Sequence, residues 1–340
     1  MSSPPRDGAR ILAEAATDVA PLILSRVGGL PPTVRHVAGL HFGWWDDDGT
    51  ALDAPPVPKS VRPALVLLAC RAVGGDARDA LDAAVAVELV HNASLLHDDV
   101  IDGDPLRRGR PSLWAAKGLP AAILVGDALF FAAVQTLGEA PHAAVTVPAL
   151  LESVQTLIEG EYRDCVQEAA VGVREDDVLV VAAAKTGELL ACACALGAVA
   201  GGAGPERVAA LRAFGRHLGI AFQCVDDVLG IWGDERATGK PATSDVRARK
   251  TSLPVAVAMA GRSPQAGELR ALYRQPGPLD DADCRRAKEL IESTGAREAT
   301  LARARQHAAE ALRHLALAAP RPGPAADLTA LMELVVHRDR

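Results

Sequence analysis

Alanine and leucine recur at intervals of three and four residues along almost the whole chain, and this spacing limits the fold more than any other feature. Side chains three and four positions apart lie on one face of an α-helix, so the pattern predicts helices that each bury one apolar face. Runs that alternate between apolar and polar residues, which form strands, are rare. The sequence therefore predicts an all-α fold.

Clusters of glycine, proline and aspartate interrupt the helical pattern and mark its loops. The longest interruption is the polar, proline-rich stretch 41–58, which precedes an apolar run that begins near Arg62. No interruption is long enough for a linker between domains, and no repeat at a solenoid period is visible in the sequence. We therefore expect a single domain over 1–340, with an N-terminal helix and loop in 1–58, the core in 59–254 and C-terminal helices in 255–340.

Composition excludes several classes of protein. The chain has 340 residues, 49% of them hydrophobic, and a formal net charge of −7, which disfavours binding to nucleic acid because that requires a basic face. No secretory signal and no apolar run of membrane-spanning length is evident, so we expect a cytoplasmic protein without a transmembrane segment. The six cysteines lie mostly in apolar surroundings without CxxC spacing, which predicts buried, unpaired thiols.

Two of the five places with adjacent aspartates stand out, because each follows a long apolar run. Asp98 and Asp99 follow AVAVELVHNASLL, and Asp226 and Asp227 follow LGIAFQCV. A pair of charged side chains at the end of a buried helix loses hydration, which costs free energy. A bound cation is the usual compensation for this cost. Asp102 is four residues after Asp98, so on a helix both project from one face and can share Mg²⁺.

Cationic residues lie next to both aspartate clusters. Arg107 and Arg108 follow the first cluster after one short loop, and arginine binds phosphate through two parallel hydrogen bonds. The chain has only six lysines, and four of them fall beside candidate phosphate-binding segments: Lys59 before Arg62-Pro63, Lys185 in KTG, Lys240 in TGK, and Lys250 in RKTSLP after the second cluster. Carboxylates and cations side by side indicate that the protein binds a metal together with a diphosphate.

On these motifs the sequence resembles the trans-isoprenyl diphosphate synthases, also called polyprenyl synthetases, from about His41 to Pro254. The family's first aspartate-rich motif, DDxxD followed by RRG, stands here as DDVIDGDPLRRGRP, and its second stands as FQCVDDVLGIWGDERATGKP. Between them lie VGD, Lys185-Thr186, and GEYRD, in which Glu161 replaces the usual Gln of GQxxD. The HFGWW loop and the HN before the first motif are similar to the geranylgeranyl-type branch.

Two further positions depart from the family's pattern. The GKxxRP motif reads PKSVRP at 58–63, which loses the glycine but keeps both cations. The last aspartate of the second DDxxD is Gly230, so metal binding there would rest on Asp226, with Asp227 or Asp234 assisting through water.

The resemblance implies a single-domain helical bundle of the isoprenoid synthase type with a central active-site cavity. It also implies a reaction in which an allylic diphosphate (dimethylallyl, geranyl or farnesyl) ionises and isopentenyl diphosphate attacks the cation through its double bond. The product would be an all-trans polyprenyl diphosphate of C20 (geranylgeranyl) or longer. Three Mg²⁺ ions per active site and a homodimer are expected from the same resemblance.

The resemblance also assigns roles to individual residues. The metal ligands would be Asp98, Asp99, Asp102, Asp226 and Asp227. The catalytic residues would be Asp98, Asp102, Arg107, Lys185, Thr186, Gln223, Asp226 and Lys240. The substrate-binding residues would be Lys59, Arg62, His91, Arg107, Arg108, Lys185, Lys240 and Lys250, of which Lys59, Arg62, His91 and Arg108 match the pocket for isopentenyl diphosphate.

Product length is expected to depend on the helix before the first aspartate pair, because one turn rises about 5.4 Å, close to one isoprene unit. One turn back from the pair are Ala93 and Ser94, which are small where short-chain relatives often carry an aromatic, and Val90 is a further turn away. The tunnel should therefore pass beyond C15, with Phe130 or Phe131 as its floor.

Other activities stay open. A class I terpene cyclase also opens with an aspartate-rich motif, but it would carry an Asn/Ser/Glu metal triad late in the chain, and the sequence shows none. An HD-type phosphohydrolase could use His91, His97 and Asp98 as metal ligands. That activity would not explain the second aspartate cluster or the lysines. A non-catalytic subunit of a heteromeric synthase is disfavoured because both metal clusters are present.

Overall fold

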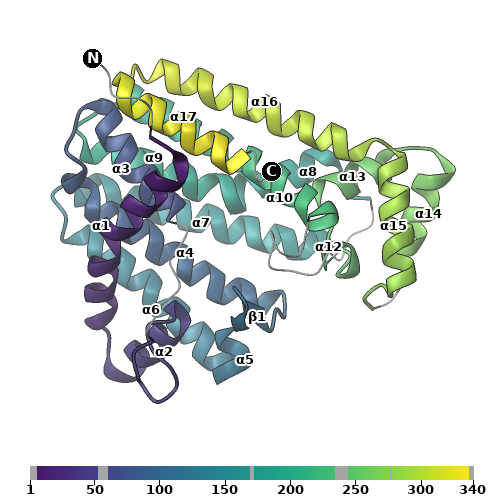
Figure 1. The fold of residues 1–340 in the computed structure, drawn as a ribbon, viewed down its shortest axis with the longest axis horizontal. Coiled ribbons are helices and arrows are strands. Elements are labelled where there is room, and N and C mark those ends of the chain that lie inside the picture. The colour runs from purple at the N-terminus through teal and green to yellow at the C-terminus, as the bar shows by residue number, and fades with distance from the viewer. Residues whose placement is uncertain (1–5, 53–59, 169–171, 234–243, 276, 337–340) are drawn as a thin grey trace. The chain divides into compact units, whose positions relative to one another are not determined.

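A computed structural model describes residues 6–52, 60–168, 172–233, 244–275 and 277–336 of the chain (Figure 1). Nearly all of its regular structure is helical, and the strands within these residues are two short segments that form a hairpin. The prediction of an all-α fold is therefore confirmed.

Long helices follow one another with short connections. In chain order the elements are α1 (Gly8–Gly28), α2 (Pro32–Phe42), α3 (Val61–Val73), η1 (Ala77–Ala80), α4 (Leu81–Ile101), β1 (Leu106–Arg107), β2 (Arg110–Pro111), α5 (Leu113–Lys117), α6 (Leu119–Gly138), α7 (Ala143–Glu168), α8 (Glu175–Ala182), η2 (Ala183–Gly187), α9 (Glu188–Ala200), α10 (Pro205–Trp232), α12 (Ser244–Arg247), α13 (Leu253–Ala260), α14 (Pro264–Tyr273), α15 (Asp281–Ser293), α16 (Ala296–Leu317) and α17 (Pro322–Val336).

The helix ends follow local signals in the sequence. The Asp280 carboxylate caps α15 by accepting hydrogen bonds of 2.8 Å from the backbone N–H groups of Ala282 and Asp283. Proline stands in the first turn of α2, α13 and α14, where the missing N–H costs nothing. Gly74 ends α3 in the left-handed conformation, and α6 ends at Gly138.

The chain divides into two compact units. The first unit comprises Met1–Val154, Cys192–Arg212 and Leu317–Leu331, and the second comprises Gln155–Ala191, Ala213–Ala316 and Met332–Arg340. The expectation of a single domain over 1–340 stays a prediction.

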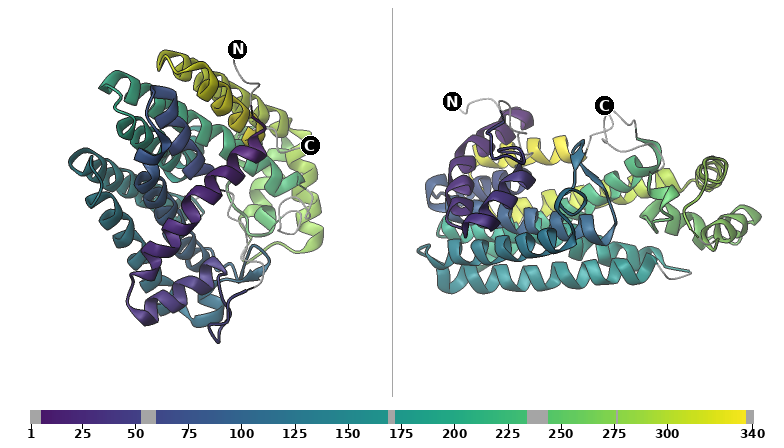
Figure 2. Two further views of the ribbon diagram at one scale, coloured as in Figure 1. Left: turned by 60° about the vertical axis from the view of Figure 1, so that its left-hand side comes forward. Right: turned by 90° about the horizontal axis from the view of Figure 1, so that it is seen from below.

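Helix α4 is the core of the first unit. Every side chain from Ala83 to Val90 is buried, and α4 packs closely along α6 (Figure 2). A helix that is apolar around its whole circumference is stable only when surrounded by other helices. The first aspartate motif stands at the C-terminal end of this helix, so it is held on a rigid support.

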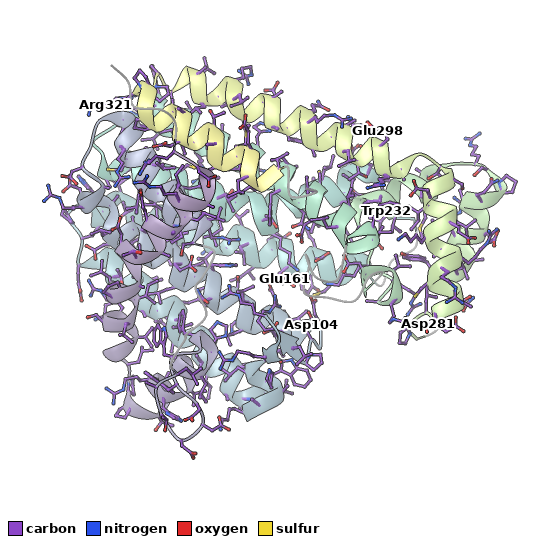
Figure 3. All side chains as sticks on the ribbon, viewed as in Figure 1. Asp104, Glu161, Trp232, Asp281, Glu298 and Arg321 are labelled. Atoms are coloured by element: carbon purple, nitrogen blue, oxygen red, sulfur yellow. The ribbon has the colours of Figure 1, made fainter. Side chains whose placement is uncertain are left out.

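The second unit has its own core around the end of α10 and helices α12 to α15. Its buried members include Ile231, Val246, Val255, Leu269, Leu290 and Ile291. The guanidinium group of Arg297 lies 5.6 Å from the ring centre of Trp232, which is labelled in Figure 3. This packing fixes the end of the helix that carries the second aspartate pair.

All six cysteines are free thiols, and five of them are buried. Burial raises the pKa of Cys70 to about 11 and that of Cys224 to about 12, so both thiols stay protonated at neutral pH. The prediction of buried cysteines outside disulfides is confirmed for five of the six.

Two segments, Leu119–Gly138 and Glu175–Ala200, are long and apolar enough to cross a membrane by length and composition alone. The expectation that no apolar run reaches this length does not hold for them. Of the apolar window in 175–200, 83% is buried inside the protein, as in a core helix. The window in α6 is 44% buried, and Ile123, Leu124 and Phe131 are among the residues of that helix that stay exposed.

Candidate active site

The first aspartate motif occupies the end of α4. Asp98 and Asp99 lie in the last turn, and Asp102 caps the helix through a backbone hydrogen bond of 2.8 Å from its N–H to the Asp98 carbonyl. The helical geometry therefore extends to Asp102 and places it one turn after Asp98. Both side chains are partly exposed, whereas Asp99 is only 1% exposed.

Asp99 is held by Arg107. The Nε of Arg107 donates a hydrogen bond of 2.7 Å to Oδ1 of Asp99, and Nη2 contacts the same oxygen. Burial lowers the pKa of Arg107, but the hydrogen bond and charge of Asp99 outweigh it, and the pKa lies above its ordinary value. The three aspartates thus divide into two accessible carboxylates and one that fixes an arginine.

Arg107 and Arg108 lie on the hairpin of β1 and β2. The two central residues, Arg108 and Gly109, have φ angles of 53° and 73°. A two-residue hairpin with positive φ at both positions suits Gly or Asn, and an arginine there costs about 1 kcal/mol. Strain of this kind is concentrated at ligand-binding segments, so the position of Arg108 supports a role in binding.

Several basic side chains lie near the two arginines of this hairpin. Burial and the charges of Arg62 and Arg108 hold the pKa of His91 well below its ordinary value. Burial also lowers the pKa of Arg62 to about 10, and the buried Nε of Arg62 has no hydrogen-bond partner among the described residues. His41 lies nearby, with Nε2 at 3.1 Å from Oδ1 of Asn92. Arg62 and Arg108 lie close enough for the charge of Arg108 to lower the pKa of Arg62 further, and two neighbouring guanidinium groups suit an anionic ligand.

A cavity of about 280 Å³ opens beside the hairpin within the first unit. Its lining residues are Leu40, His41, Asp46, Asp47, Leu95, Arg107, Arg108, Arg110, Pro111, Ser112, Leu113 and Ala116. Three arginines and two aspartates thus line this cavity, and arginine can bind a phosphate group through two parallel hydrogen bonds.

The predicted chain-length residues lie on α4 and α6. Val90 and Ala93 are fully buried, and the Ser94 hydroxyl donates a hydrogen bond of 2.9 Å to the His91 carbonyl. Phe130 packs against His97 with ring centres 5.7 Å apart. Phe131, in contrast, is 76% exposed, so it closes no cavity within its own chain, and Phe130 is the better candidate for the floor.

Lys185 and Thr186 lie in η2, a π-helical segment of the second unit, and such wide turns are frequent at functional sites. The Nζ of Lys185 is 2.9 Å from Oδ2 of Asp164 and 2.7 Å from Oε2 of Glu161, which is labelled in Figure 3. Glu161, which departs from the family motif, therefore forms an ion pair with Lys185.

A chain of hydrogen bonds runs from η2 to the second aspartate pair. The Thr186 hydroxyl donates to Oε1 of Gln223 at 2.7 Å, and Nε2 of Gln223 donates to Oδ1 of Asp227 at 2.8 Å. The other Asp227 oxygen accepts from the backbone N–H of Leu253 at 2.8 Å. Burial raises the pKa of Asp227 to about 7 in spite of these two hydrogen bonds. Asp226 is exposed, so here too the first aspartate is accessible and the second is tied into the protein.

Asp245 was not identified from the sequence. A Cβ atom added at Gly230 would lie 2.0 Å from Oδ2 of Asp245, so this carboxylate occupies the space of a side chain at position 230. Gly230 is one turn after Asp226 on α10, where the family has an aspartate. The backbone N–H of Lys250 also bonds to the Asp245 carbonyl, at 2.8 Å. The sequence shows that a side chain is missing at position 230, but it does not show that Asp245 fills the space.

Three predicted residues, Lys59, Asp234 and Lys240, lie outside the described residues. Their roles stay predictions.

Comparison with known proteins shows the family of the chain. The sequence profile of the polyprenyl synthetase family matches residues 55–294. A geranylgeranyl diphosphate synthase of Mycobacterium tuberculosis is 40% identical over 343 residues, which cover 100% of this chain and 97% of that protein. A (2E,6E)-farnesyl diphosphate synthase of Mycobacterium bovis is 38% identical over 96% of this chain and 92% of its own length.

The crystal structure of a polyprenyl synthetase from Streptomyces coelicolor A3(2) superimposes with a TM-score of 0.92 at 39% identity, covering 97% of this chain and 100% of that one. This chain belongs to the polyprenyl synthetase family.

Proposed function

We propose that this protein condenses isopentenyl diphosphate with an allylic diphosphate in a Mg²⁺-dependent reaction and makes an all-trans polyprenyl diphosphate of C20 or longer. Its family makes it a trans-prenyltransferase, and the allylic primer would be dimethylallyl, geranyl or farnesyl diphosphate. The observation that carries the proposal is the end of α4, where the accessible carboxylates of Asp98 and Asp102 stand beside the arginine hairpin.

The carboxylates fit Mg²⁺, which prefers hard oxygen ligands and keeps places for water and substrate phosphates. Asp98, Asp102 and Asp226 are the accessible members of the predicted set, and we assign the ligand role to them. Asp99 and Asp227 are buried and hydrogen-bonded, so we assign them a positioning role. The bound metal would neutralise negative charge on the departing diphosphate, and three ions remain an expectation from the family.

The cationic side chains complete the allylic site in this proposal. Negative charge grows on the diphosphate as the allylic C–O bond breaks, and cations fixed in advance stabilise it without reorganisation. Arg107 is fixed by Asp99, and Lys185 is fixed by Asp164 and Glu161. Lys240 and Lys250 would bind the same group.

Isopentenyl diphosphate would bind to Arg62, His91, Arg108 and Lys59, without metal. The buried Nε of Arg62, which lacks a protein partner among the described residues, supports an anion at this place. The isopentenyl double bond would then attack the allylic cation, and the proton lost afterwards would leave the site with the diphosphate.

Replacing Arg108 with glycine separates its role in binding from its role in the hairpin. Arg108→Gly removes a cation and relieves the positive-φ strain, so Tm should stay unchanged or rise while KM for isopentenyl diphosphate increases by about tenfold or more. KM for the allylic diphosphate should change less. Steady-state kinetics with each substrate varied in turn measures both values, and equal increases would contradict the assignment of this pocket.

For the second motif, we propose that Asp245 supplies the carboxylate that Gly230 lacks. Its Oδ2 atom occupies the space of a residue-230 side chain, one turn beyond Asp226. The motif would then keep its full number of carboxylates, with one of them contributed from α12.

The small, buried side chains of α4 support a product longer than C15. Ala93→Phe places an aromatic ring one turn before the aspartates, and the main product should shorten by at least one isoprene unit. Ala86→Phe, two turns further back on the same face, is the matched control and should shorten the product less. Chromatography of the dephosphorylated products, with isopentenyl diphosphate in excess, measures both. A wild-type enzyme that stops at farnesyl diphosphate, or equal effects of the two variants, would show that α4 does not set the length.

We propose a homodimer through the apolar face of α6. Leu119, Ile123, Leu124 and Phe131 are all exposed on this helix, and exposed apolar faces of this kind are buried by association. In the dimer, the partner would also cover exposed apolar residues of α6, a helix that is long and apolar enough to cross a membrane. We therefore propose that the protein is cytoplasmic. Phe131→Glu should shift the dimer to monomer in sedimentation at micromolar concentration, and a wild-type monomer would refute the proposal.

Incubation with labelled isopentenyl diphosphate, an allylic primer and Mg²⁺ tests the proposed reaction. Incorporation of label into longer prenyl diphosphates is expected. Cyclic hydrocarbons made from the primer alone would identify a terpene cyclase, and release of phosphate without condensation would identify a phosphohydrolase.

A further inference from the structure

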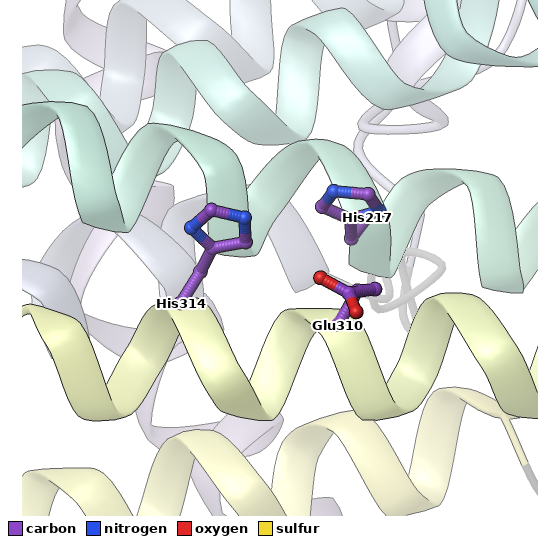
Figure 4. A group of neighbouring side chains, drawn as sticks. All are labelled: His217, Glu310 and His314. Atoms are coloured by element: carbon purple, nitrogen blue, oxygen red, sulfur yellow. The ribbon is translucent and has the colours of Figure 1, made fainter.

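A second cluster of titratable side chains lies in the second unit, outside the residues assigned to the reaction. It consists of His217 on α10 and of Glu310 and His314 on α16 (Figure 4). One nitrogen or oxygen from each of these residues lies within 4.8 Å of those from the other two. All three side chains are partly exposed, so an ion in solution can reach them.

Helical spacing brings these groups together. Glu310 and His314 are four residues apart on α16, and His307 precedes Glu310 by three, so all three share one face. His217 meets this face from α10, as Figure 4 shows. An ion held by this set would therefore connect two helices.

A hydrogen bond between two histidine rings fixes the orientation of His217. Nδ1 of His217 and Nδ1 of His307 are 2.9 Å apart, so one ring donates a hydrogen bond to the other. When His217 donates from Nδ1, its Nε2 keeps a lone pair for a metal, and a hydrogen bond on the other ring nitrogen is the usual way in which a metal-binding histidine is oriented.

A cation already lies against two of these ligands. Arg313 donates from Nε to Oε2 of Glu310 and from Nη2 to Nε2 of His314, each at 2.8 Å. The Arg313 side chain is 54% exposed, so it can move into solvent at little cost when another cation takes its place. The carboxylate of Glu310 and the imidazole of His314 thus already bind one cationic side chain between them.

We propose that His217, Glu310 and His314 bind a divalent transition metal ion such as Zn²⁺, with His307 orienting His217. Two imidazole nitrogens and one carboxylate favour Zn²⁺, Co²⁺ or Ni²⁺ over Mg²⁺, which prefers oxygen ligands. The aspartate motifs offer only carboxylates, so the two kinds of site select different metals. The ion joins α10 to α16 and stabilises the second unit.

Equilibrium dialysis of the tag-free, full-length protein against Zn²⁺ tests this site. The buffer contains millimolar Mg²⁺, which occupies the carboxylate sites and leaves imidazole ligands free. We expect about one Zn²⁺ per chain and a higher Tm than that of the EDTA-treated protein. His217→Ala and His314→Ala should each weaken binding by about tenfold or more and abolish the rise in Tm.

Two further variants serve as controls. His142→Ala removes an exposed histidine outside the cluster and should leave Zn²⁺ binding unchanged. Arg313→Ala removes the competing cation and should tighten binding several-fold. Circular dichroism of the EDTA-treated variants checks that each is folded. A wild-type protein that binds no Zn²⁺ above millimolar Mg²⁺, or a His217→Ala/His314→Ala double variant with unchanged stoichiometry and affinity, would overturn the proposal.

Discussion

Asp98→Ala, Asp102→Ala and Asp226→Ala should each reduce turnover by at least about a hundredfold, which corresponds to roughly 2.7 kcal/mol of lost transition-state stabilisation. The three carboxylates are the accessible members of the two motifs, so each removal takes a ligand from the metal that neutralises the leaving diphosphate. Their accessibility also means that the fold should survive. Turnover is measured at saturating substrate, with circular dichroism as the check on folding.

Two matched variants show whether the effect is specific. Asp48→Ala removes an exposed carboxylate from a loop of the first unit and should leave turnover unchanged. Asp99→Asn removes the buried partner of Arg107, so it should lower Tm and raise KM for the allylic diphosphate, with little change in the Mg²⁺ concentration for half-maximal activity. Turnover of Asp98→Ala within a few-fold of wild type would remove Asp98 from the site.

The sequence predicts the helical fold and the place of both motifs, because these depend on spacing along a single helix. Alanine and leucine at intervals of three and four, followed by paired aspartates, are enough to put the first carboxylates at the end of a buried helix. The structure has α4 in that place, with Asp98 and Asp102 one turn apart.

The partners of each aspartate could not be predicted, because they come from segments distant in the chain. The sequence pairs Asp98 with Asp102 by their helical spacing, but it does not show that Asp99 is held by Arg107 on its hairpin. Asp227 is distinguished from Asp226 in the same way, by Gln223 and by the start of α13. Phe131 was a candidate for the tunnel floor because it lies on the helix after Gly126-Asp127, but its position on α6 leaves it 76% exposed.

The Gly230 position gives the last test, since a carboxylate can be moved from one helix to another. Asp245→Ala removes the carboxylate that occupies the space beside Gly230. It should reduce turnover by about tenfold and raise the Mg²⁺ concentration for half-maximal activity. Gly230→Asp alone restores the family residue but forces its Cβ to within 2.0 Å of the Asp245 oxygen, so one carboxylate must be displaced. Lower Tm and lower turnover are expected for this variant.

The double variant Gly230→Asp/Asp245→Ala should recover both properties, because the new carboxylate enters the space that the old one has left. Turnover within a few-fold of wild type, a wild-type Mg²⁺ requirement and a Tm above that of Gly230→Asp are the expected results. If the two substitutions instead act independently, their free-energy effects add, and the double variant has a lower turnover than either single variant. Such additivity would show that Asp245 has another role. Recovery would mean that the second motif needs a carboxylate at this place, whichever helix provides it.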